Sequence, residues 1–340
     1  MEGGVDRISN LPDDILVKIM SPLSAKTILS RFCLKYTYDG EHCLHISQWI
    51  NFVFRRGVQE LELDFINSHC YYEMPIGFFN YEGMTIFKLS LCLLKRSNSF
   101  KIYSMLKSLH LNAMKLTSDL LNEVIKIAFF WKIFILRNVI SLSIQDCKIL
   151  ERGLITNTPR LQFFEYFGRL IPFYMEMMPF VQHVELDFEH ELVLVNASEE
   201  LDKRLYLPIT LIFLKHLTIK ADLHRELPSI EFLLKISPNL ETLSIEMVTC
   251  FSQNYWETKR LEFGCFAHNF KTMKINDFNR WKNKLQFIQY VLKNALVLEK
   301  LIINITRKGV SDEYHSTLLV TAQEIRDYPR ASLHAKVLIQ

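Results

Sequence analysis

One short pattern, apolar–x–x–apolar–x–apolar, recurs along most of this 340-residue chain. A single match carries little information, because any strand with one buried face can produce it. Repeated matches at fairly regular intervals are far more restrictive, since they indicate stacked copies of one structural unit. The ten matches are Val58/Leu61/Leu63, Ile86/Leu89/Leu91, Leu106/Leu109/Leu111, Val139/Leu142/Ile144, Leu161/Phe164/Tyr166, Val181/Val184/Leu186, Leu214/Leu217/Ile219, Leu240/Leu243/Ile245, Phe270/Met273/Ile275 and Leu298/Leu301/Ile303.

The alternation in the last three positions of each match predicts a short strand with one buried face. One such unit cannot bury its apolar side alone, so the units must stack. Successive matches start roughly 20 to 33 residues apart, a spacing that brackets the period of leucine-rich repeats. We therefore predict an α/β fold, a leucine-rich-repeat solenoid whose curved parallel sheet carries helices on its outside.

Three of the connecting segments have helical periodicity. We expect helices at residues 46–56, 227–236 and 281–296, and we expect Pro228 and Pro238 to bracket the second. The apolar faces are predicted to hold Ile46, Trp49, Ile50 and Val53 in the first helix, and Trp281, Leu285, Ile288, Leu292 and Leu296 in the third.

The N-terminal stretch from Asp6 to Leu23 predicts a short amphipathic helix. Asn10 fits the position that caps the first turn, and Pro12 is tolerated there because its missing N–H would have no partner. Apolar residues then recur at steps of three and four, which builds one apolar stripe suited to docking or to core packing.

This stretch resembles the opening of an F-box, through the run Leu11-Pro12-Asp13-Asp14-Ile15-Leu16 with Ile19 and Leu23 behind it. It is most similar to the F-box of a large plant group that joins an F-box to leucine-rich repeats and a C-terminal FBD domain. The second half of the motif is shortened, and Leu29-Ser30-Arg31-Phe32 is interpreted as a reduced version of its ending.

The C-terminal eighty or so residues resemble the FBD domain of the same group. The resemblance rests on Asn294–Leu301, on Ala322-Gln323-Glu324-Ile325, on the Pro329-Arg330-Ala331-Ser332 run and on a closing strand at Lys336–Ile339. An FBD domain here implies a cap for the last repeat of the solenoid, which needs a terminal unit with a polar outer face. The resemblance divides the chain into a partial F-box-like segment at 1–45, irregular repeats at 46–260 and an FBD-like domain at 261–340.

Composition excludes several classes of function. The formal net charge is only +3, which argues against binding nucleic acid through a broad basic surface, and no glycine-rich phosphate loop occurs. The seven cysteines are scattered without a C-x-x-C pair, so a reducing intracellular compartment, the nucleus and/or the cytoplasm, is expected.

The most apolar window, Val124–Ile144, is interrupted by Lys126, Lys132 and Arg137 and falls short of a membrane span. A buried helix followed by a buried strand is the favoured interpretation, and a membrane-associated segment is the alternative. The role of its first part, residues 124–139, is not explained by the repeat pattern.

No catalytic, cofactor-binding or metal-binding residues are predicted, so we do not expect an enzyme. The alternating Glu185, Asp187, Glu189 and Glu191 could form a carboxylate row, but the solvated face of a strand explains them more simply. The histidines near Cys43 and Cys70 do not have the spacing of a closed zinc site.

The resemblance implies a non-catalytic substrate-recognition subunit of an SCF-type (cullin) E3 ubiquitin ligase. In such a protein the F-box binds a Skp-type adaptor, and through it a cullin scaffold, while the repeats hold a target protein. The residues expected at the adaptor are Leu11, Pro12, Ile15, Leu16, Ile19 and Leu23. The exposed residues suggested for target contact are Glu60, Glu62, His110, Glu185, Lys215, Thr218 and Lys274.

The shortened F-box keeps an alternative open. In that alternative the chain is a repeat-type protein-binding scaffold, or a degenerate F-box copy, that has no association with a ligase.

Overall fold

The computed structural model of the chain describes residues 30–40, 43–65, 68–75, 81, 83–94, 105–116, 138–145, 160–168, 180–188, 210–221, 223–247, 263–278, 282–305 and 311–340. The chain divides into two compact units, one formed by Met1–Glu151 with Thr156–Arg160 and the other by Arg152–Ile155 with Leu161–Gln340. The predicted helix at residues 6–23 and the apolar segment at 124–137 lie outside the described residues.

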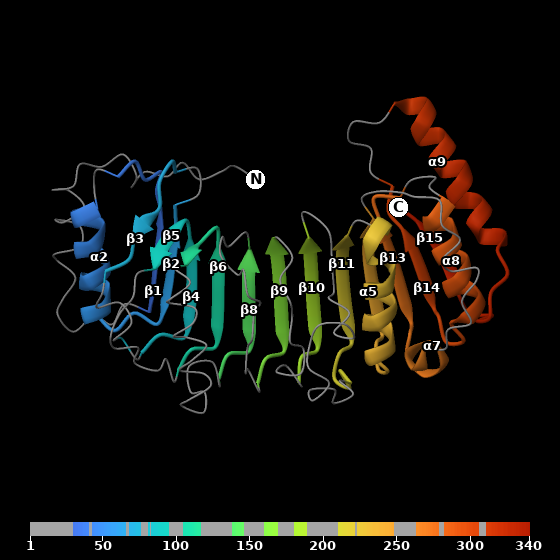
Figure 1. The fold of residues 1–340 in the computed structure, drawn as a ribbon, viewed down its shortest axis with the longest axis horizontal. Helices are drawn as coiled ribbons and strands as arrows, with labels where there is room; N and C mark the ends of the chain where they lie inside the picture. Colours follow the sequence, from blue (N-terminus) through green and yellow to red (C-terminus); the bar gives the residue numbers. More distant parts are fainter. Residues whose placement is uncertain are drawn as a thin grey trace. The chain divides into compact units, whose positions relative to one another are not determined.

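The first unit contains a parallel sheet with the strand order β1-β2-β4-β6-β8 (Figure 1). A smaller parallel sheet, β3-β5-β7, follows the carboxyl ends of the main strands. The elements are β1 (Arg31–Lys35), α2 (Cys43–Arg55), β2 (Glu60–Asp64), β3 (Tyr72–Glu73), β4 (Ile86–Ser90), β5 (Cys92–Leu94), β6 (Ser108–Asn112), β7 (Lys115–Leu116) and β8 (Ser141–Gln145).

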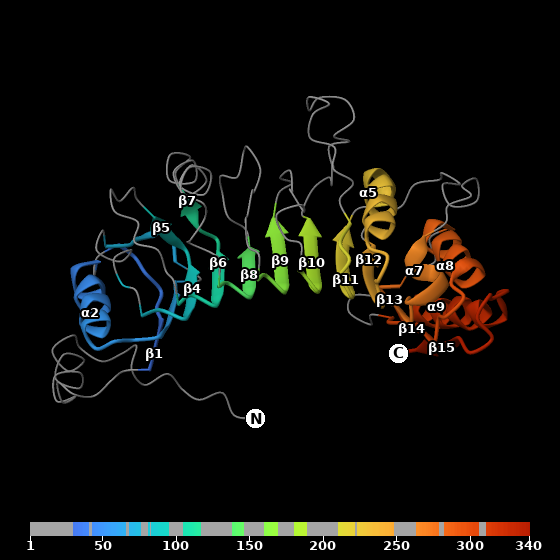
Figure 2. The same cartoon turned by 90° about the horizontal axis from the view of Figure 1, so that it is seen from below.

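The second unit contains the strands β9 to β15, which pair in chain order and in parallel. In this unit α5, α7 and α8 lie on one face of the sheet (Figure 2). The elements are β9 (Phe163–Gly168), β10 (His183–Phe188), β11 (His216–Ala221), α5 (Leu223–Ile236), β12 (Thr242–Met247), α7 (Gly264–His268), β13 (Thr272–Asn276), α8 (Lys282–Asn294), β14 (Lys300–Ile303), α9 (Asp312–Glu324), η3 (Ile325–Asp327) and β15 (Lys336–Ile339).

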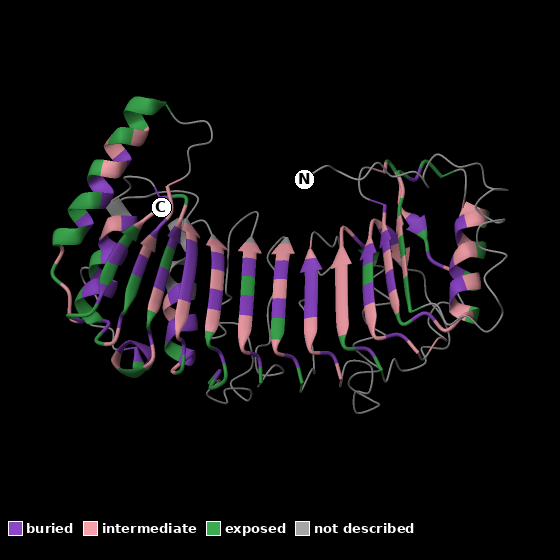
Figure 3. Cartoon of the chain, turned by 180° about the vertical axis from the view of Figure 1, so that it is seen from behind, coloured by how far each residue is buried: buried purple, intermediate pink, exposed green. Residues whose placement is uncertain are grey.

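The repeat pattern correctly predicts the buried face of nearly every strand. In β12, β13 and β14 the in-register residues Leu243, Met273 and Leu301 are fully buried, and so is the next apolar position of each strand. Figure 3 shows the result as bands of buried residues that alternate with more exposed ones along the strands. Regular stacking of such units confirms the α/β fold class with a parallel sheet of leucine-rich-repeat type.

The predicted frame of the second repeat is wrong by two residues. Its buried residues are Met84, Phe87 and Leu89, whereas Leu91 follows the strand with a left-handed backbone (φ 54°). Both frames satisfy the apolar pattern. The two frames bury the same face of the strand, so the register selects between them: Phe87 and Leu89 stand opposite Leu61 and Leu63 of β2, and Leu91 lies beyond the paired residues.

The interpretation of residues 29–32 as a shortened F-box ending is also wrong for the part that the structure describes. Arg31–Lys35 forms strand β1, and Phe32 and Leu34 stand opposite Leu61 and Leu63 of β2. The segment therefore adds one more strand before the first predicted repeat.

The predicted helices are present, with altered ends. Helix α2 buries Ile46, Ile50 and Val53 as expected. Helix α5 begins at Leu223, so Pro228 lies inside it instead of at its start. Helix α8 ends at Asn294, which leaves Leu296 beyond the helix and 57% exposed.

Candidate functional site

The open face of each sheet is the candidate functional site. In a strand, alternate side chains point to opposite sides, and here one side fills the core. Because the strands pair in parallel and in register, the other side chains form rows that run across neighbouring strands. These rows are what a binding partner would meet.

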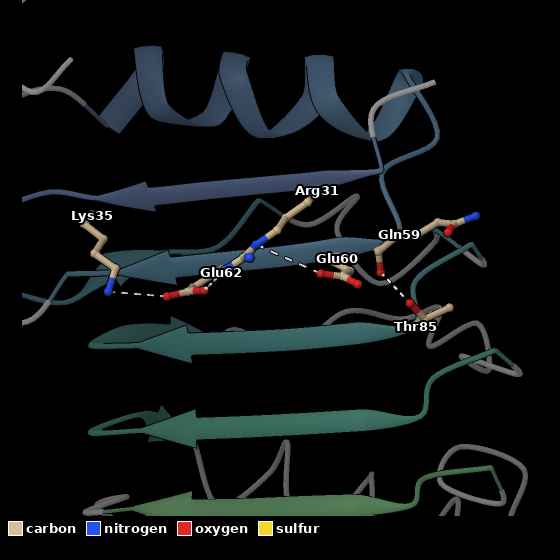
Figure 4. A network of polar contacts seen from close by, with 6 residues as sticks. All are labelled: Arg31, Lys35, Gln59, Glu60, Glu62 and Thr85. Atoms are coloured by element: carbon tan, nitrogen blue, oxygen red, sulfur yellow. Dashed lines mark hydrogen bonds and ion pairs between the residues drawn. The ribbon is translucent and has the colours of Figure 1, made fainter. Parts of the chain in front are cut away.

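In the first unit, the charged side chains of β1 and β2 form a network of opposite charges (Figure 4). The Arg31 guanidinium donates a hydrogen bond to Glu62 at 3.0 Å and lies 4.0 Å from the Glu60 carboxylate. The Lys35 ammonium lies 3.5 Å from both Glu62 and Asp64. Two of the suggested target-contact residues, Glu60 and Glu62, are therefore already paired within the chain.

This network controls the ionisation of Glu62. Partial burial acts to raise its pKa, but the hydrogen bond from Arg31 and the charges of Lys88 and Lys35 together lower the pKa below its ordinary value. The Glu62 carboxylate thus stays ionised, as a structural ion pair requires.

A shallow hollow of about 160 Å³ lies over β2, β4, β6 and β8 of the first unit. Its lining includes Glu62, Lys88 and His110, so a further suggested target-contact residue belongs to it. The Nε2 atom of His110 lies 2.8 Å from the Ser108 hydroxyl in a hydrogen bond. The hollow is lined mainly by polar and charged side chains of both signs.

In the second unit, the open face of β9 to β11 gathers carboxylates. Glu185 stands in register with Glu165, and Asp187 lies two residues further along β10. Partial burial, and then the charges of Glu165 and Asp187, raise the pKa of Glu185. Asp187 has a counter-ion in Lys220 of β11 at 3.4 Å. Among the described residues, Glu185 forms no ion pair.

A row of three stacked rings crosses the same strands. The Phe163 and His183 rings lie 4.6 Å apart with an interplanar angle of 14°, and the His183 and His216 rings lie 4.3 Å apart at 10°. Partial burial and the neighbouring His216 lower the pKa of His183. The sequence pattern placed these histidines near strands, but it did not indicate that they stack.

The other suggested contact residues are spread over β11 to β13. Lys215 is paired with Glu241 at 2.9 Å, and this hydrogen bond lowers the pKa of Glu241. Thr218 stands between Glu185 and Ser244 in the same row, and Lys274 follows in that row on β13. The structure therefore brings Glu185, Thr218 and Lys274 into one row of the open face, whereas Lys215 lies in the turn before β11.

The contacts of the Pro329-Arg330-Ala331-Ser332 run show what it does in this structure. The buried Ser332 hydroxyl donates a 2.6 Å hydrogen bond to the Leu298 carbonyl, and the Ala331 N–H donates to the Leu292 carbonyl. The Arg330 guanidinium donates to the Ala335 carbonyl at 2.8 Å and also to the Arg326 carbonyl. The run thus fixes the turn that delivers β15 to the sheet edge beside β14.

The described residues contain little that suggests bond chemistry. No group of three or more His, Cys, Asp or Glu side chains in this part of the chain could hold a metal ion. Cys92 and Cys265 are buried, and burial raises the pKa of both thiols. No helix among the described residues is long and apolar enough to span a membrane. The predicted adaptor-contact residues, Leu11, Pro12, Ile15, Leu16, Ile19 and Leu23, lie outside the described residues.

The parallel repeat sheets with open polar faces define a repeat protein of the leucine-rich-repeat type. Comparison with known proteins narrows the family. The FBD family profile matches residues 262–303. An F-box/FBD/LRR-repeat protein of Arabidopsis thaliana is 24% identical over 333 residues, which covers 86% of this chain and 76% of that relative. Both matches confirm the resemblance to plant F-box/leucine-rich-repeat/FBD proteins.

Proposed function

We propose that this protein is a substrate-recognition subunit of an SCF-type (cullin) E3 ubiquitin ligase, acting in the nucleus and/or the cytoplasm. In this role, its N-terminal segment binds a Skp-type adaptor, and the open faces of its sheets bind a target protein. The protein itself makes and breaks no bonds. Ubiquitin transfer becomes fast because the target is held close to the charged conjugating enzyme.

One observation carries this proposal, namely the FBD match at residues 262–303 on a chain of parallel repeats. The open faces suit protein recognition, since they present rows of charged, polar and aromatic side chains on a rigid sheet. Rigid presentation reduces the conformational entropy that binding must overcome.

The first experiment is a pull-down of the full chain with a purified Skp-type adaptor. We expect the wild-type chain to bind, and we expect Ile15→Asp to abolish binding because it places a charge in the predicted apolar stripe. Ser21→Asp is the matched control, since residue 21 falls opposite the centre of the apolar stripe in the predicted helix. Absence of wild-type binding, with the circular dichroism of a folded repeat protein retained, would refute the ligase role.

A second candidate is a protein-binding scaffold without ligase association. The observation that favours it is strand β1, because residues that could have completed the F-box are used in the sheet instead. This candidate predicts that affinity capture from plant extract recovers a reproducible target while purified adaptor fails to bind. Recovery of adaptor and cullin together with the target would exclude it.

A further inference from the structure

Three kinds of side chain follow one another in a fixed order along β9, β10 and β11 and the turns that lead into β10 and β11 of the second unit. An apolar rim precedes the strands, the stacked rings occupy their start, and the carboxylates follow. The order is set by the backbone, because residues at equal positions of parallel in-register strands lie side by side.

The apolar rim consists of Phe180, Ile212 and Phe213. These side chains are 47%, 49% and 41% exposed, and the Phe180 and Phe213 rings lie 5.2 Å apart. Three large apolar residues exposed together favour contact with an apolar group of another molecule.

The ring row of Phe163, His183 and His216 comes next. Phe163 is 44% exposed. The residue in register with His216 on the next strand is Thr242. The row of rings therefore ends at His216, next to a small side chain. A planar cation can lie against such rings, and guanidinium does so more readily than ammonium.

The carboxylates Glu165 and Glu185 come last, together with Asp187, whose carboxylate lies 3.4 Å from the Lys220 ammonium. Glu185 has two like-charged neighbours, and their repulsion together with partial burial raises its pKa. A cation placed here would relieve that repulsion and would gain charge-assisted hydrogen bonds.

We propose that this face binds an arginine-containing cationic segment of the target protein, with an apolar residue on the rim and guanidinium groups against the rings and carboxylates. Charge complementarity selects this occupant over an acidic one. The inference rests on the proposed role of the open faces in target recognition and specifies the partner's chemistry.

The test is a fluorescence-anisotropy titration of the full chain with a labelled synthetic heptapeptide that holds one leucine and two arginines separated by glycines. We expect saturable binding that weakens as salt is added, because exposed charges are screened. The same peptide with glutamate in place of arginine should not bind. Equal binding of the two peptides would overturn the proposal.

Charge reversal locates the site. We expect Glu185→Lys to weaken binding about tenfold or more, since it replaces an attractive charge with a repulsive one. Glu299→Lys is the matched control, because it makes the same change at an exposed position between β13 and β14. Its affinity should stay within about twofold of wild type. Equal losses in both variants would show a general charge effect and refute the assigned face.

The rings are tested through the choice of cation. The wild-type chain should prefer the arginine peptide to its lysine counterpart, and His216→Ala should reduce that preference. An unchanged preference for the arginine peptide in His216→Ala would show that the rings do not contact the bound cation. The titration contains no adaptor, so the two experiments are independent. A chain that does not bind the adaptor can still bind the peptide, and a chain that does not bind the peptide can still bind the adaptor.

Discussion

Two adjacent isoleucines on β14 provide a sharp test of the repeat architecture. Ile303 is fully buried, and it stands in register with Ile275 of β13 and Ile339 of β15. Ile302 points to the open face and is only half-buried. Replacing each with alanine removes the same atoms from opposite sides of one strand.

The expected difference follows from burial. Ile303→Ala loses a fully buried side chain and leaves a cavity between three strands, so the free energy of unfolding should fall by about 2–5 kcal/mol. Ile302→Ala creates no enclosed cavity, and its cost should stay below about 1 kcal/mol.

Urea unfolding followed by far-ultraviolet circular dichroism measures both values on the full chain. With a slope of about 2–3 kcal/mol per molar urea, Ile303→Ala should lower the unfolding midpoint by about 0.7–2.5 M. An equal shift for the two variants, or a larger shift for Ile302→Ala, would refute the assigned faces of β14 and with them the repeat frame.

Three further predictions concern single side chains. Ser332→Ala leaves the Leu298 carbonyl without its buried partner, so urea unfolding should show a loss of about 1–2 kcal/mol; an unchanged midpoint would contradict the anchoring role of the run. Burial lowers the pKa of His183, so the folded state disfavours its protonated form, and the free energy of unfolding should fall as pH drops through the ordinary value of 6.5. The slope of stability between pH 7.5 and about 5.5 should be smaller in His183→Gln, and an identical slope would exclude the effect. Burial raises the pKa of Cys265 to about 12. In the native protein a thiol reagent should therefore label the exposed Cys33 faster than the buried Cys265, and the two labelling rates should converge in urea. Rapid labelling of Cys265 in the native protein would show that its site opens.

Local pattern was a reliable guide wherever one face of a strand had to be buried. The triplet Leu240/Leu243/Ile245 is buried throughout, as its sequence alone required. The same holds for the closing strand, which was predicted at residues 336–339 and is found there as β15. Burial of alternate residues is a property of each strand by itself, so it can be read locally.

Local pattern failed where two frames or two structures fitted equally well. Residues 84–91 satisfy the repeat in two frames, and the register with β2 decides between them. In the observed frame Phe87 is buried and Ile86 is only half-buried. Residues 29–32 are interpreted as an F-box ending from sequence alone, but Arg31–Lys35 forms a strand, because pairing with β2 stabilises it there. In each case the deciding energy comes from a neighbour that is distant in sequence.

The candidate site was predictable only in part. The open-face positions of Glu60, Glu62 and Glu185 followed from alternation, but the charges around each carboxylate did not. Glu62 is held by Arg31 and Lys35, whereas Glu185 faces other carboxylates. The stacking of His183 on Phe163 was equally hidden, since it depends on the register between β9 and β10.

The sequence by itself therefore determined that this chain is a stack of strand-forming units with an FBD-like C-terminal part, because the apolar periodicity of each strand and the Pro-Arg-Ala-Ser run can both be recognised within short stretches of sequence. Only the tertiary structure decided which open-face side chains meet, because parallel register brings together residues from successive repeats. Charges and rings interact across a few ångströms of space, and their distances along the chain carry no record of that proximity.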